Sequence, residues 1–400
     1  MRWPFSTLFA LVFFLGPLRD AGAEAGDELT ISLLTFGPGD HPFSKFGHNG
    51  LLVENAVLRT TVVYNYGTFS FQSIDLIPKF LLGKYRYWLS VQSLDSTLAT
   101  YTAENRSVVA QRLRLDPEQK RAMVAFLAFN ARDENKYYLF DYYRDNCATR
   151  IRDLIDRATK GALARVSSHP AEMSWRGHTE RLTADDLPVY LGLYVAMGNV
   201  IDRPITQWEE MFLPAKLAEG IARADLVDRE TVLARDRRPA PRASPPSWTG
   251  RAAAAGTVGA ALVGVLGHFA ARGRRAARVG LGVALGMLGS LFGLFGCLFL
   301  FLWIFTNHEV AYHNENILQL APFALLLPGA GVGVAKNRPG AATRASRLAL
   351  AALASSALGI ALKVLPWFSQ DNILVIAFAL PLWAGAAAST HLVAGAIHKK

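Results

Sequence analysis

The chain has 400 residues, of which 51% are apolar and only 18% are charged, whereas an average soluble domain has about 25% charged residues. This composition excludes a disordered chain and indicates two or three structural units, part of them in a membrane. The net charge of +10 does not indicate nucleic-acid binding, because residues 251–400 hold 12 Lys and Arg against 3 Asp and Glu, whereas residues 1–250 hold 30 against 29. We therefore expect no nucleic-acid partner.

The first 23 residues have the pattern of a bacterial export signal. Arg2 precedes an apolar stretch over residues 5–15, and Ala21-Gly22-Ala23 forms a small-x-small cleavage site. The alternative, a first transmembrane helix, is disfavoured because the apolar stretch is shorter than the ~20 residues that cross a bilayer. We expect residues 1–23 to be a signal peptide and residues 24–228 to form a domain in the periplasm.

Residues 24–228 predict an α+β domain in which strands outnumber long helices. Apolar alternation and β-branched residues predict strands over residues 28–36, 51–54, 60–66, 85–92 and 107–115, and residues 137–142 are predicted to be extended. Helices are predicted over residues 73–82 and 97–105. A third helix begins after Asp116, since Pro117 and Gln119 complete an N-terminal capping pattern, and it should run to about residue 131.

Cys147 falls at the start of the next predicted helix, behind Asp145 and Asn146 as possible caps. Free N–H groups and a partial positive charge at a helix N-terminus lower the pKa of a thiol and stabilise an oxyanion. This position predicts a nucleophile. The alternative is a small apolar residue of the core. The second cysteine, Cys297, lies in an apolar segment and is not expected to pair with Cys147.

A nucleophilic cysteine needs a base, and His48 is the candidate that we favour. It precedes a predicted strand and is flanked by Gly47 and Gly50, which allow close approach of backbone or substrate. We expect a side-chain nitrogen of His48 within ~4 Å of the Cys147 sulfur. Spacing alone does not exclude the other exported histidines, which are His41, His169 and His178.

The remainder of the chain predicts a linker and a transmembrane domain. Residues 229–250 are predicted to be a Pro- and Arg-rich linker. Five apolar segments in residues 251–400 can each cross about 30 Å of hydrocarbon; they lie near residues 252–271, 279–305, 317–335, 346–368 and 373–397. The first and third loops between them are basic, and the second and fourth contain no Lys or Arg. This alternation places the basic loops in the cytoplasm and agrees with an exported domain before the first span.

The second loop, residues 306–316, faces outward and is rich in His, Glu and Asn. One interpretation is a solvated turn between two spans. The other is a lip of the active site that binds a polar head group, and its candidate substrate contacts are His308, Glu309, His313, Asn314 and Asn316. The two histidines lack the i, i+4 spacing of a helical zinc site, so we expect no metal.

Several ordered blocks of the exported domain resemble the Lnb family of lipoprotein N-acyltransferases. They are Gly37-Pro38-Gly39, Phe46-Gly47-His48, Tyr64-Asn65-Tyr66-Gly67-Thr68-Phe69, Glu104-Asn105-Arg106 and Asp145-Asn146-Cys147-Ala148-Thr149-Arg150. The resemblance covers about residues 27–225, and the outward loop resembles the membrane part of the family more weakly. It implies a fold similar to circularly permuted papain-like enzymes, in which His precedes Cys.

The resemblance implies that Cys147 is the nucleophile and His48 the base. Asn65 and Tyr66 are candidates to orient the imidazole, and we do not choose between them. Asn49 and Asn146 are further candidates for orienting the base or holding an oxyanion, and Arg150 is a candidate substrate contact.

The implied reaction moves an acyl chain from a membrane phospholipid, through a Cys147 thioester, to the N-terminal amine of a lipoprotein, without a cofactor. The protein would be embedded in the bacterial inner membrane with its catalytic domain in the periplasm. Two alternatives remain, which are a cysteine peptidase or amidase acting on cell-wall peptides and a non-enzymatic membrane scaffold.

Overall fold

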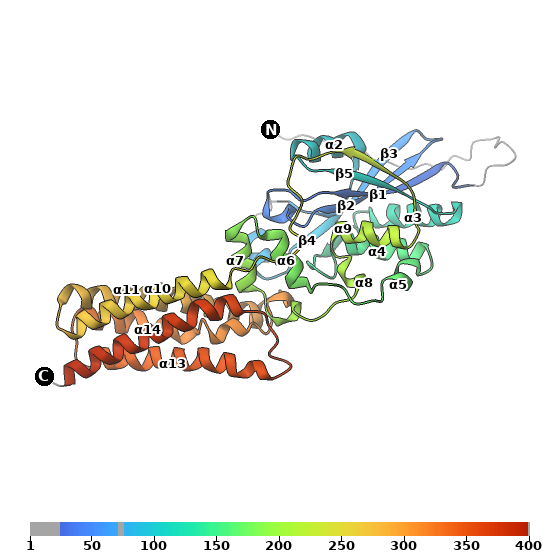
Figure 1. Ribbon diagram of the computed structural model, residues 1–400. Helices are drawn as coiled ribbons and strands as arrows, with labels where there is room; N and C mark the ends of the chain where they lie inside the picture. The colour runs from blue at the N-terminus through green and yellow to red at the C-terminus, as the bar shows by residue number, and fades with distance from the viewer. Residues whose placement is uncertain (1–24, 71–75, 399–400) are drawn as a thin grey trace, which may run out of the picture.

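The computed structural model describes residues 25–70 and 76–398, so the predicted export signal lies outside the described residues. The chain forms a sheet-containing domain at one end and a bundle of long helices at the other (Figure 1). This arrangement confirms the α+β class of the first part and the helical class of the second.

A seven-stranded antiparallel sheet organises the first domain, in the order β6-β4-β3-β2-β1-β5-β7. The strands are β1 (Leu29–Phe36), β2 (His48–Asn55), β3 (Thr60–Thr68), β4 (Arg86–Ser93), β5 (Val108–Leu113), β6 (Tyr137–Leu139) and β7 (Val227–Ala234). In β1 and β2, Phe36 pairs with His48, so β1 ends where β2 begins. Each of the six strands before β7 falls within or beside a predicted strand.

Strand β7 corrects the predicted linker, which was expected to begin at residue 229. Residues 227–234 instead pair with β5. The backbone of β5 would otherwise be an unpaired sheet edge, and this pairing covers it. The connection to the membrane domain is therefore shorter than predicted and follows residue 234.

Helices cover both faces of the sheet. Helices α3 (Pro117–Asn130), α4 (Cys147–Ala158) and α9 (Pro214–Arg223) pack on one face, over a core that contains Leu33, Leu51 and Ile151. Helix α2 (Leu94–Ala103) packs on the other face, over Phe36 and Val63. The alternation of side chains along each strand gives both faces an apolar surface.

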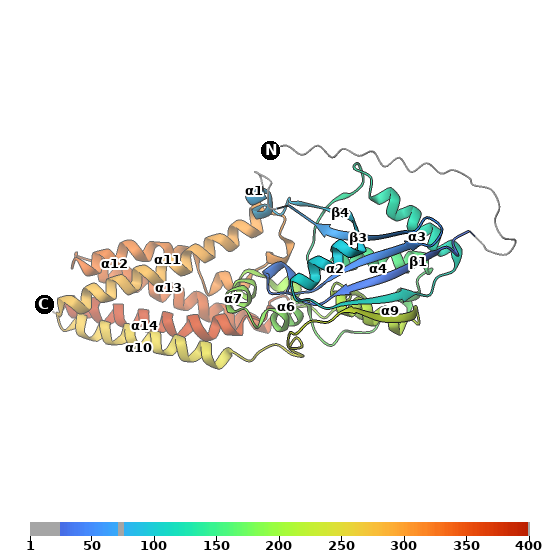
Figure 2. The ribbon, with the colours of Figure 1, turned by 90° about the horizontal axis from the view of Figure 1, so that it is seen from above.

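Shorter helices connect the sheet to the membrane domain. They are α1 (Leu76–Leu81), α5 (Ala162–Val166), α6 (Trp175–Thr183), α7 (Leu187–Ala196) and α8 (Gln207–Glu210). Helix α1 lies beside the end of α11 (Figure 2), and the Asn307 N–H donates to the Leu82 carbonyl at 2.9 Å. The sheet domain therefore touches the membrane domain through both α1 and the α6–α7 pair.

Four helices of the described residues are long and apolar enough to cross a membrane, or five if a bent pair counts as one span. The four are α10 (Thr249–Ala271), α11 (Arg275–Phe305), α13 (Ala341–Ala361), extended by the turn Leu362–Val364, and α14 (Ile373–His398). The predicted segment 317–335 falls within a longer bent pair, Glu309–Leu318 with Pro322–Ala335 at 59°. Helix α12 (Leu327–Ala335) is its last part. Pro322 supplies no N–H for a continuous helix.

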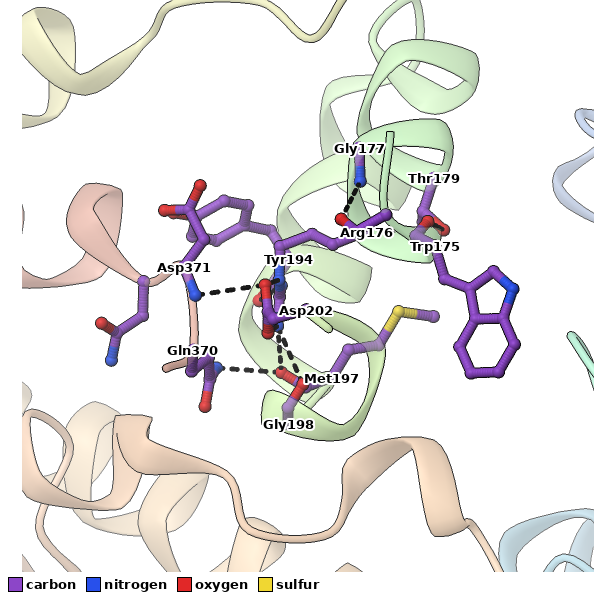
Figure 3. Close-up of polar contacts among 12 residues, drawn as sticks. Trp175, Arg176, Gly177, Thr179, Tyr194, Met197, Gly198, Asp202, Gln370 and Asp371 are labelled. Atoms are coloured by element: carbon purple, nitrogen blue, oxygen red, sulfur yellow. Dashed lines mark hydrogen bonds and ion pairs between the residues drawn. The ribbon is translucent and has the colours of Figure 1, made fainter. Parts of the chain in front are cut away.

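Buried polar contacts join the two domains around the end of α7. Arg176 on α6 forms a buried ion pair with Asp202, with Nε 2.6 Å from Oδ1, and donates to the Met197 and Gly198 carbonyls (Figure 3). From the membrane domain, the Asp371 N–H donates to Asp202 and the Gln370 amide donates to the Met197 carbonyl. Buried charges require such complete pairing, so this contact fixes the sheet domain on the helix bundle.

Candidate active site

Cys147 is the first residue of α4, and Asn146 is its N-cap. The Asn146 Oδ1 accepts hydrogen bonds from the N–H groups of Ala148 and Thr149 at 2.9 and 3.0 Å. Its Nδ2 donates to the Tyr142 and Phe212 carbonyls. Because these bonds use both ends of the amide, Asn146 positions the helix start and has no donor left for an oxyanion. The uncertainty between Asp145 and Asn146 as the cap is thus resolved.

The thiol of Cys147 faces backbone N–H groups. Burial raises the pKa of this thiol, and the N–H groups of Asn49, Ala148 and Cys147 itself, together with the charge of Arg106, oppose the rise. The expectation that the helix start lowers the pKa overall is therefore wrong, because desolvation of the thiolate outweighs the N–H groups. The same N–H groups are placed to stabilise an oxyanion next to the sulfur, although that of Ala148 is shared with the Asn146 cap.

The N–H of Asn49 is available because the sheet opens at this point. Strand β2 pairs with β1 from residue 48 onward, but its pairing with β3 begins only at Leu51. Asn49 therefore contributes through its backbone. Its side-chain Nδ2 donates to the Leu34 carbonyl and to the Thr35 hydroxyl.

His48 is the first residue of β2, and its ring is stacked among aromatic side chains. The ring centroid lies 5.6 Å from that of Phe36 and 6.2 Å from that of Tyr101. Burial and, to a smaller extent, the charge of Arg106 lower the pKa of His48 to about 4, against the opposing effect of a side-chain hydrogen bond with Asn65. The imidazole is consequently neutral at pH 7 and can accept a proton.

The structure separates the two candidates for orienting His48. Asn65 is buried, and its side chain raises the pKa of the imidazole by hydrogen bonding. Its Oδ1 accepts no hydrogen bond of good geometry from the described residues. Tyr66 points to the opposite face of β3, where its hydroxyl accepts a hydrogen bond from Asn130 at 3.1 Å. Gly50 makes room for Asn65, since a Cβ at that position would lie 2.9 Å from the Asn65 Oδ1. Asn65 is thus the residue that adjoins the candidate base.

Cys147 and His48 are neighbours, but they do not bond directly. Cys147 packs with the cluster under α4, and the His48 ring stacks with Phe36 under α2. Asn49, the residue after His48, supplies the N–H that faces the thiol. Among the described residues no hydrogen bond joins the Cys147 sulfur to the imidazole. The predicted distance of ~4 Å between a side-chain nitrogen of His48 and the Cys147 sulfur stays a prediction.

Arg106 is a site residue that was not singled out from the sequence. It is 5% exposed, its Nε donates to the Gly37 carbonyl at 2.7 Å, and its guanidinium lies 4.6 Å from the Tyr101 ring. One guanidinium nitrogen, Nη2, is buried and has no hydrogen-bond partner among the residues that the structure describes. Its positive charge lowers the pKa of both His48 and Cys147. The only signal in the sequence was its place in the block Glu104-Asn105-Arg106, because its proximity to the thiol depends on the pairing of β5 with β1.

The guanidinium of Arg150 is bound by Asp145, two residues before the start of α4. Its guanidinium forms two hydrogen bonds with the Asp145 carboxylate, at 2.6 and 2.7 Å, and lies 3.6 Å from the centre of the Tyr138 ring. These contacts use Nε and Nη2 of the guanidinium. Its role as a substrate contact stays a prediction.

The outward loop divides into two parts. His308 donates to the Phe80 carbonyl at 2.8 Å, Glu309 pairs with Arg144, and both residues line a pocket at the domain contact. Asn314 and Asn316 are buried, and their amides donate to the last carbonyls of α7. His313 is exposed and packs on Trp303. The loop is thus a docking element, and only its first part adjoins a pocket.

The other histidines considered above lie elsewhere. His178 is fully buried, with Nε2 donating to Glu210 and Nδ1 accepting from Arg181, which is a structural arrangement. His41 and His169 are exposed. Within residues 25–70 and 76–398 no group of three or more His, Cys, Asp or Glu side chains is arranged to hold a metal ion.

Two family models match the chain, one for each domain. The model described as the Lnb N-terminal periplasmic domain matches residues 22–181, and the model described as the Lnb transmembrane domain matches residues 258–383. Searches of curated proteins and of solved structures found no match. The two matches occur in the order of the two domains and together cover most of the chain.

Proposed function

Because the chain belongs to the Lnb family, as a membrane protein with a periplasmic N-terminal domain, we propose that it is a cysteine acyltransferase of the bacterial inner membrane. It takes an acyl chain from a phospholipid onto Cys147 and passes it to the N-terminal amine of a lipoprotein. In this proposal the periplasmic domain is a permuted papain-like fold, with His48 on a strand before Cys147 on a helix.

The observation that carries the proposal is the position of Cys147. Its thiol lies at the start of a capped helix and faces the backbone N–H groups of Asn49 and Cys147. The residue before Asn49 is His48, whose imidazole is neutral at pH 7. A nucleophile, donors for an oxyanion and a base are the groups that acyl transfer requires. The domain that carries them is fixed to membrane-spanning helices, so both lipid substrates stay within reach.

The first half-reaction forms a thioester. His48 accepts the Cys147 proton, and the thiolate attacks the carbonyl carbon of a phospholipid ester. The N–H groups of Asn49 and Cys147 stabilise the negative charge on the carbonyl oxygen. A C–S bond forms as the C–O bond breaks, and the imidazolium returns its proton to the departing alkoxide, which leaves as a lysophospholipid.

The second half-reaction forms an amide. The neutral amine of a diacylglyceryl-cysteine N-terminus attacks the thioester carbonyl, and His48 takes a proton from the attacking nitrogen. The C–N bond forms, the C–S bond breaks, and the thiolate leaves and regains its proton from the imidazolium. No oxidant, metal or cofactor takes part in either half.

The titration of the two groups supports general-base catalysis over a preformed ion pair. Burial raises the pKa of the Cys147 thiol and lowers that of His48 to about 4, so both are neutral at pH 7. The proton therefore moves as the substrate binds. Catalytic hydrogen bonds are often long or poorly aligned before substrate is bound, so His48 can act as the base although no hydrogen bond joins it to the Cys147 sulfur among the described residues.

The test is complementation in cells depleted of their usual lipoprotein N-acyltransferase, with mass spectrometry of lipoprotein N-termini. The wild type is expected to restore N-acylation. Cys147→Ser should abolish it, and His48→Ala should reduce it by about 10²–10⁴-fold, the usual contribution of a general base. Cys297→Ser is the matched control, because it removes the other thiol and should change little.

Full activity in Cys147→Ser would refute the nucleophile. A wild type that leaves lipoproteins unmodified but cleaves cell-wall peptides would establish the peptidase alternative instead. A wild type without either activity, in a protein that is correctly inserted, would favour a scaffold.

A further inference from the structure

A small pocket lies where the sheet domain meets the membrane domain. The space in it that water-sized molecules can occupy is about 30 Å³, which is room for about two or three waters. One wall is the loop that follows α11, with His308 and Glu309, and the other is the edge of the sheet domain, with Asp141 and five aromatic side chains. This size excludes an acyl chain and suits a small polar group.

The pocket lies at the depth at which a membrane span ends. Helix α11 is long and apolar enough to cross a membrane and ends at Phe305, and Asn307 lines the pocket only two residues later. Helix α1 lies beside this end of α11 (Figure 2), and the carbonyl of Phe80 on α1 accepts a hydrogen bond from His308 at 2.8 Å. Phospholipid head groups occupy the zone just outside the hydrocarbon, so the head group is the part of a lipid nearest to the pocket.

The aromatic rings of the sheet-domain wall stand at steep angles to one another. Tyr85 and Tyr87 meet edge to face at 82°, with their centroids 5.8 Å apart, and Phe140 and Tyr142 meet at 87° and 5.7 Å. Tyr87 stacks on Phe140 at 4.3 Å, which joins the two pairs. Aromatic rings that meet at such angles can border a cation on more than one side, and their electron-rich faces attract it.

Asp141 adds a negative charge to this wall. Its Oδ1 accepts hydrogen bonds from the N–H groups of Tyr143 and Arg144 at 2.9 and 2.7 Å, and no hydrogen bond or ion pair with another described residue engages its Oδ2. The other acid of the lining, Glu309, is paired with the Arg144 guanidinium. The pocket thus keeps one carboxylate without a cation beside aromatic rings, which favours an ammonium group and disfavours an anion.

The same wall is connected to the start of α4, which carries the nucleophile. The Tyr142 carbonyl accepts a hydrogen bond at 2.9 Å from Asn146, the cap residue before Cys147. Phe140 is a neighbour of that cysteine, since a Cβ on Gly67 would lie 3.9 Å from the Phe140 ring and 3.6 Å from the Cys147 Cβ. A lipid bound with its ester at the thiol would therefore have its head group near the pocket.

We propose that this pocket binds a primary ammonium group, and that the ethanolamine head group of the donor phospholipid supplies it. The inference rests on the proposed function, because it names the head group of the donor in that reaction. The N-terminal amine of the acceptor lipoprotein is a second source of the same chemistry. That amine must be neutral to attack the thioester, whereas the pocket favours a charged group, so we assign the pocket to the donor.

The test uses the full-length protein with donor vesicles of either phosphatidylethanolamine or phosphatidylglycerol, both with the same acyl chains. Asp141→Asn removes the charge and keeps an oxygen for the two backbone N–H groups. Tyr142→Leu removes one ring of the wall, and Tyr142→Phe keeps it. Asp225→Asn is the matched control, because its side chain is 84% exposed, pairs with Arg114 and does not line the pocket. Thermal unfolding establishes that each variant is folded.

Two readouts are compared. The first is the rate of single-turnover thioester formation from each donor, without acceptor. The second, independent of catalysis, is the affinity of the same variants in a Cys147→Ser background for short-chain forms of the two phospholipids, measured by calorimetry.

Both readouts should show a preference of the parent protein for phosphatidylethanolamine. Asp141→Asn should lower this preference by about tenfold or more, because it removes a charge-assisted hydrogen bond. Tyr142→Leu should lower it by about threefold or more, through loss of a cation–π contact. Tyr142→Phe and Asp225→Asn should keep the preference of the parent.

Equal use of the two donors by the parent, or an unchanged preference in folded Asp141→Asn, would overturn the proposal. So would an effect confined to the second half-reaction, seen as a raised KM for a diacylglyceryl-cysteine peptide, because it would assign the pocket to the acceptor. Absence of a thioester in the parent with every donor would instead refute the proposed function, and the calorimetry would still report whether the pocket selects an ethanolamine head group.

Discussion

The partly buried position of His48 predicts an unusual pH dependence for the first half-reaction. An imidazole with an ordinary pKa of about 6.5 would be about 10% neutral at pH 5.5. With its pKa lowered to about 4 by burial and by Arg106, His48 would be about 97% neutral at the same pH. A base with the ordinary value would therefore lose about tenfold in rate between pH 8 and pH 5.5, whereas this protein should lose almost nothing.

The assay is lysophospholipid release in a single turnover without acceptor, followed between pH 3.5 and pH 8. The acceptor is omitted because its α-amine titrates near 7.7–8.0 and would add an acid limb of its own. Arg106→Gln removes the nearby positive charge, so its acid limb should move upward toward 6.5, and Arg106→Lys should stay closer to the wild type. An acid limb between pH 6 and 7 in the wild type, or an unchanged limb in Arg106→Gln, would refute the reasoning.

Three further predictions concern the start of α4, the contact between the two domains and the membrane topology. Asn146→Ala should lower the free energy of unfolding by about 3 kcal/mol, the sum of a cap and two side-chain hydrogen bonds, whereas the exposed cap variant Asp116→Ala should cost about 1 kcal/mol; denaturant unfolding monitored by fluorescence measures both. Arg144→Ala breaks an exposed ion pair to the outward loop and should change the same free energy by less than about 1 kcal/mol. Reporters fused at Arg274 and Tyr312 should report cytoplasm and periplasm, respectively, because basic loops stay inside.

Each of these has a clear contrary result. Equal losses in the two cap variants would show that the Asn146 amide does no more than an ordinary cap. A large loss in Arg144→Ala would mean that the domain contact depends on this exposed pair. Reversed reporter signals at either fusion site would overturn the topology.

The same burial of His48 gives a stability prediction with a definite sign. The unfolded chain takes up a proton near pH 6.5, whereas the native His48 does so only near its lowered pKa of about 4. The stabilisation from this group is therefore present above pH 6.5 and is lost as the pH falls toward 4. In His48→Gln this part of the pH dependence of unfolding should disappear.

Much of the periplasmic domain was predictable because its local signals agree with its packing. Asp116, Pro117 and Gln119 predicted the start of α3, where the structure has a complete capping box. The alternation of residues 28–36 predicted β1, both faces of which are covered. Strand β7 was missed because most of its residues are exposed and three of them are charged, so its pairing with β5 depends on the open edge of the sheet and not on apolar periodicity.

The site itself was predictable only in part. The position of Cys147 at a helix start followed from the polar residues before it, and Asn146 has the predicted cap role. The direction of the Cys147 pKa shift was missed, because local sequence shows the helix start but not the burial that opposes it. The choice of Asn65 over Tyr66 depended on which face of β3 each residue occupies. The position of Arg106 beside the site depends on the pairing of β5 with β1, two strands far apart in the sequence, and no local sequence pattern encodes that pairing.

The most direct test of the central claim is to isolate an acyl-enzyme. The full-length protein is incubated with phospholipid that carries an isotope-labelled acyl chain, quenched in acid and digested, and the peptide that contains Cys147 is analysed by mass spectrometry. The account predicts one labelled acyl group on Cys147, removed by neutral hydroxylamine and transferred to an added diacylglyceryl-cysteine peptide. Acyl transfer to that peptide with no label ever found on Cys147, or undiminished transfer by Cys147→Ser, would contradict it.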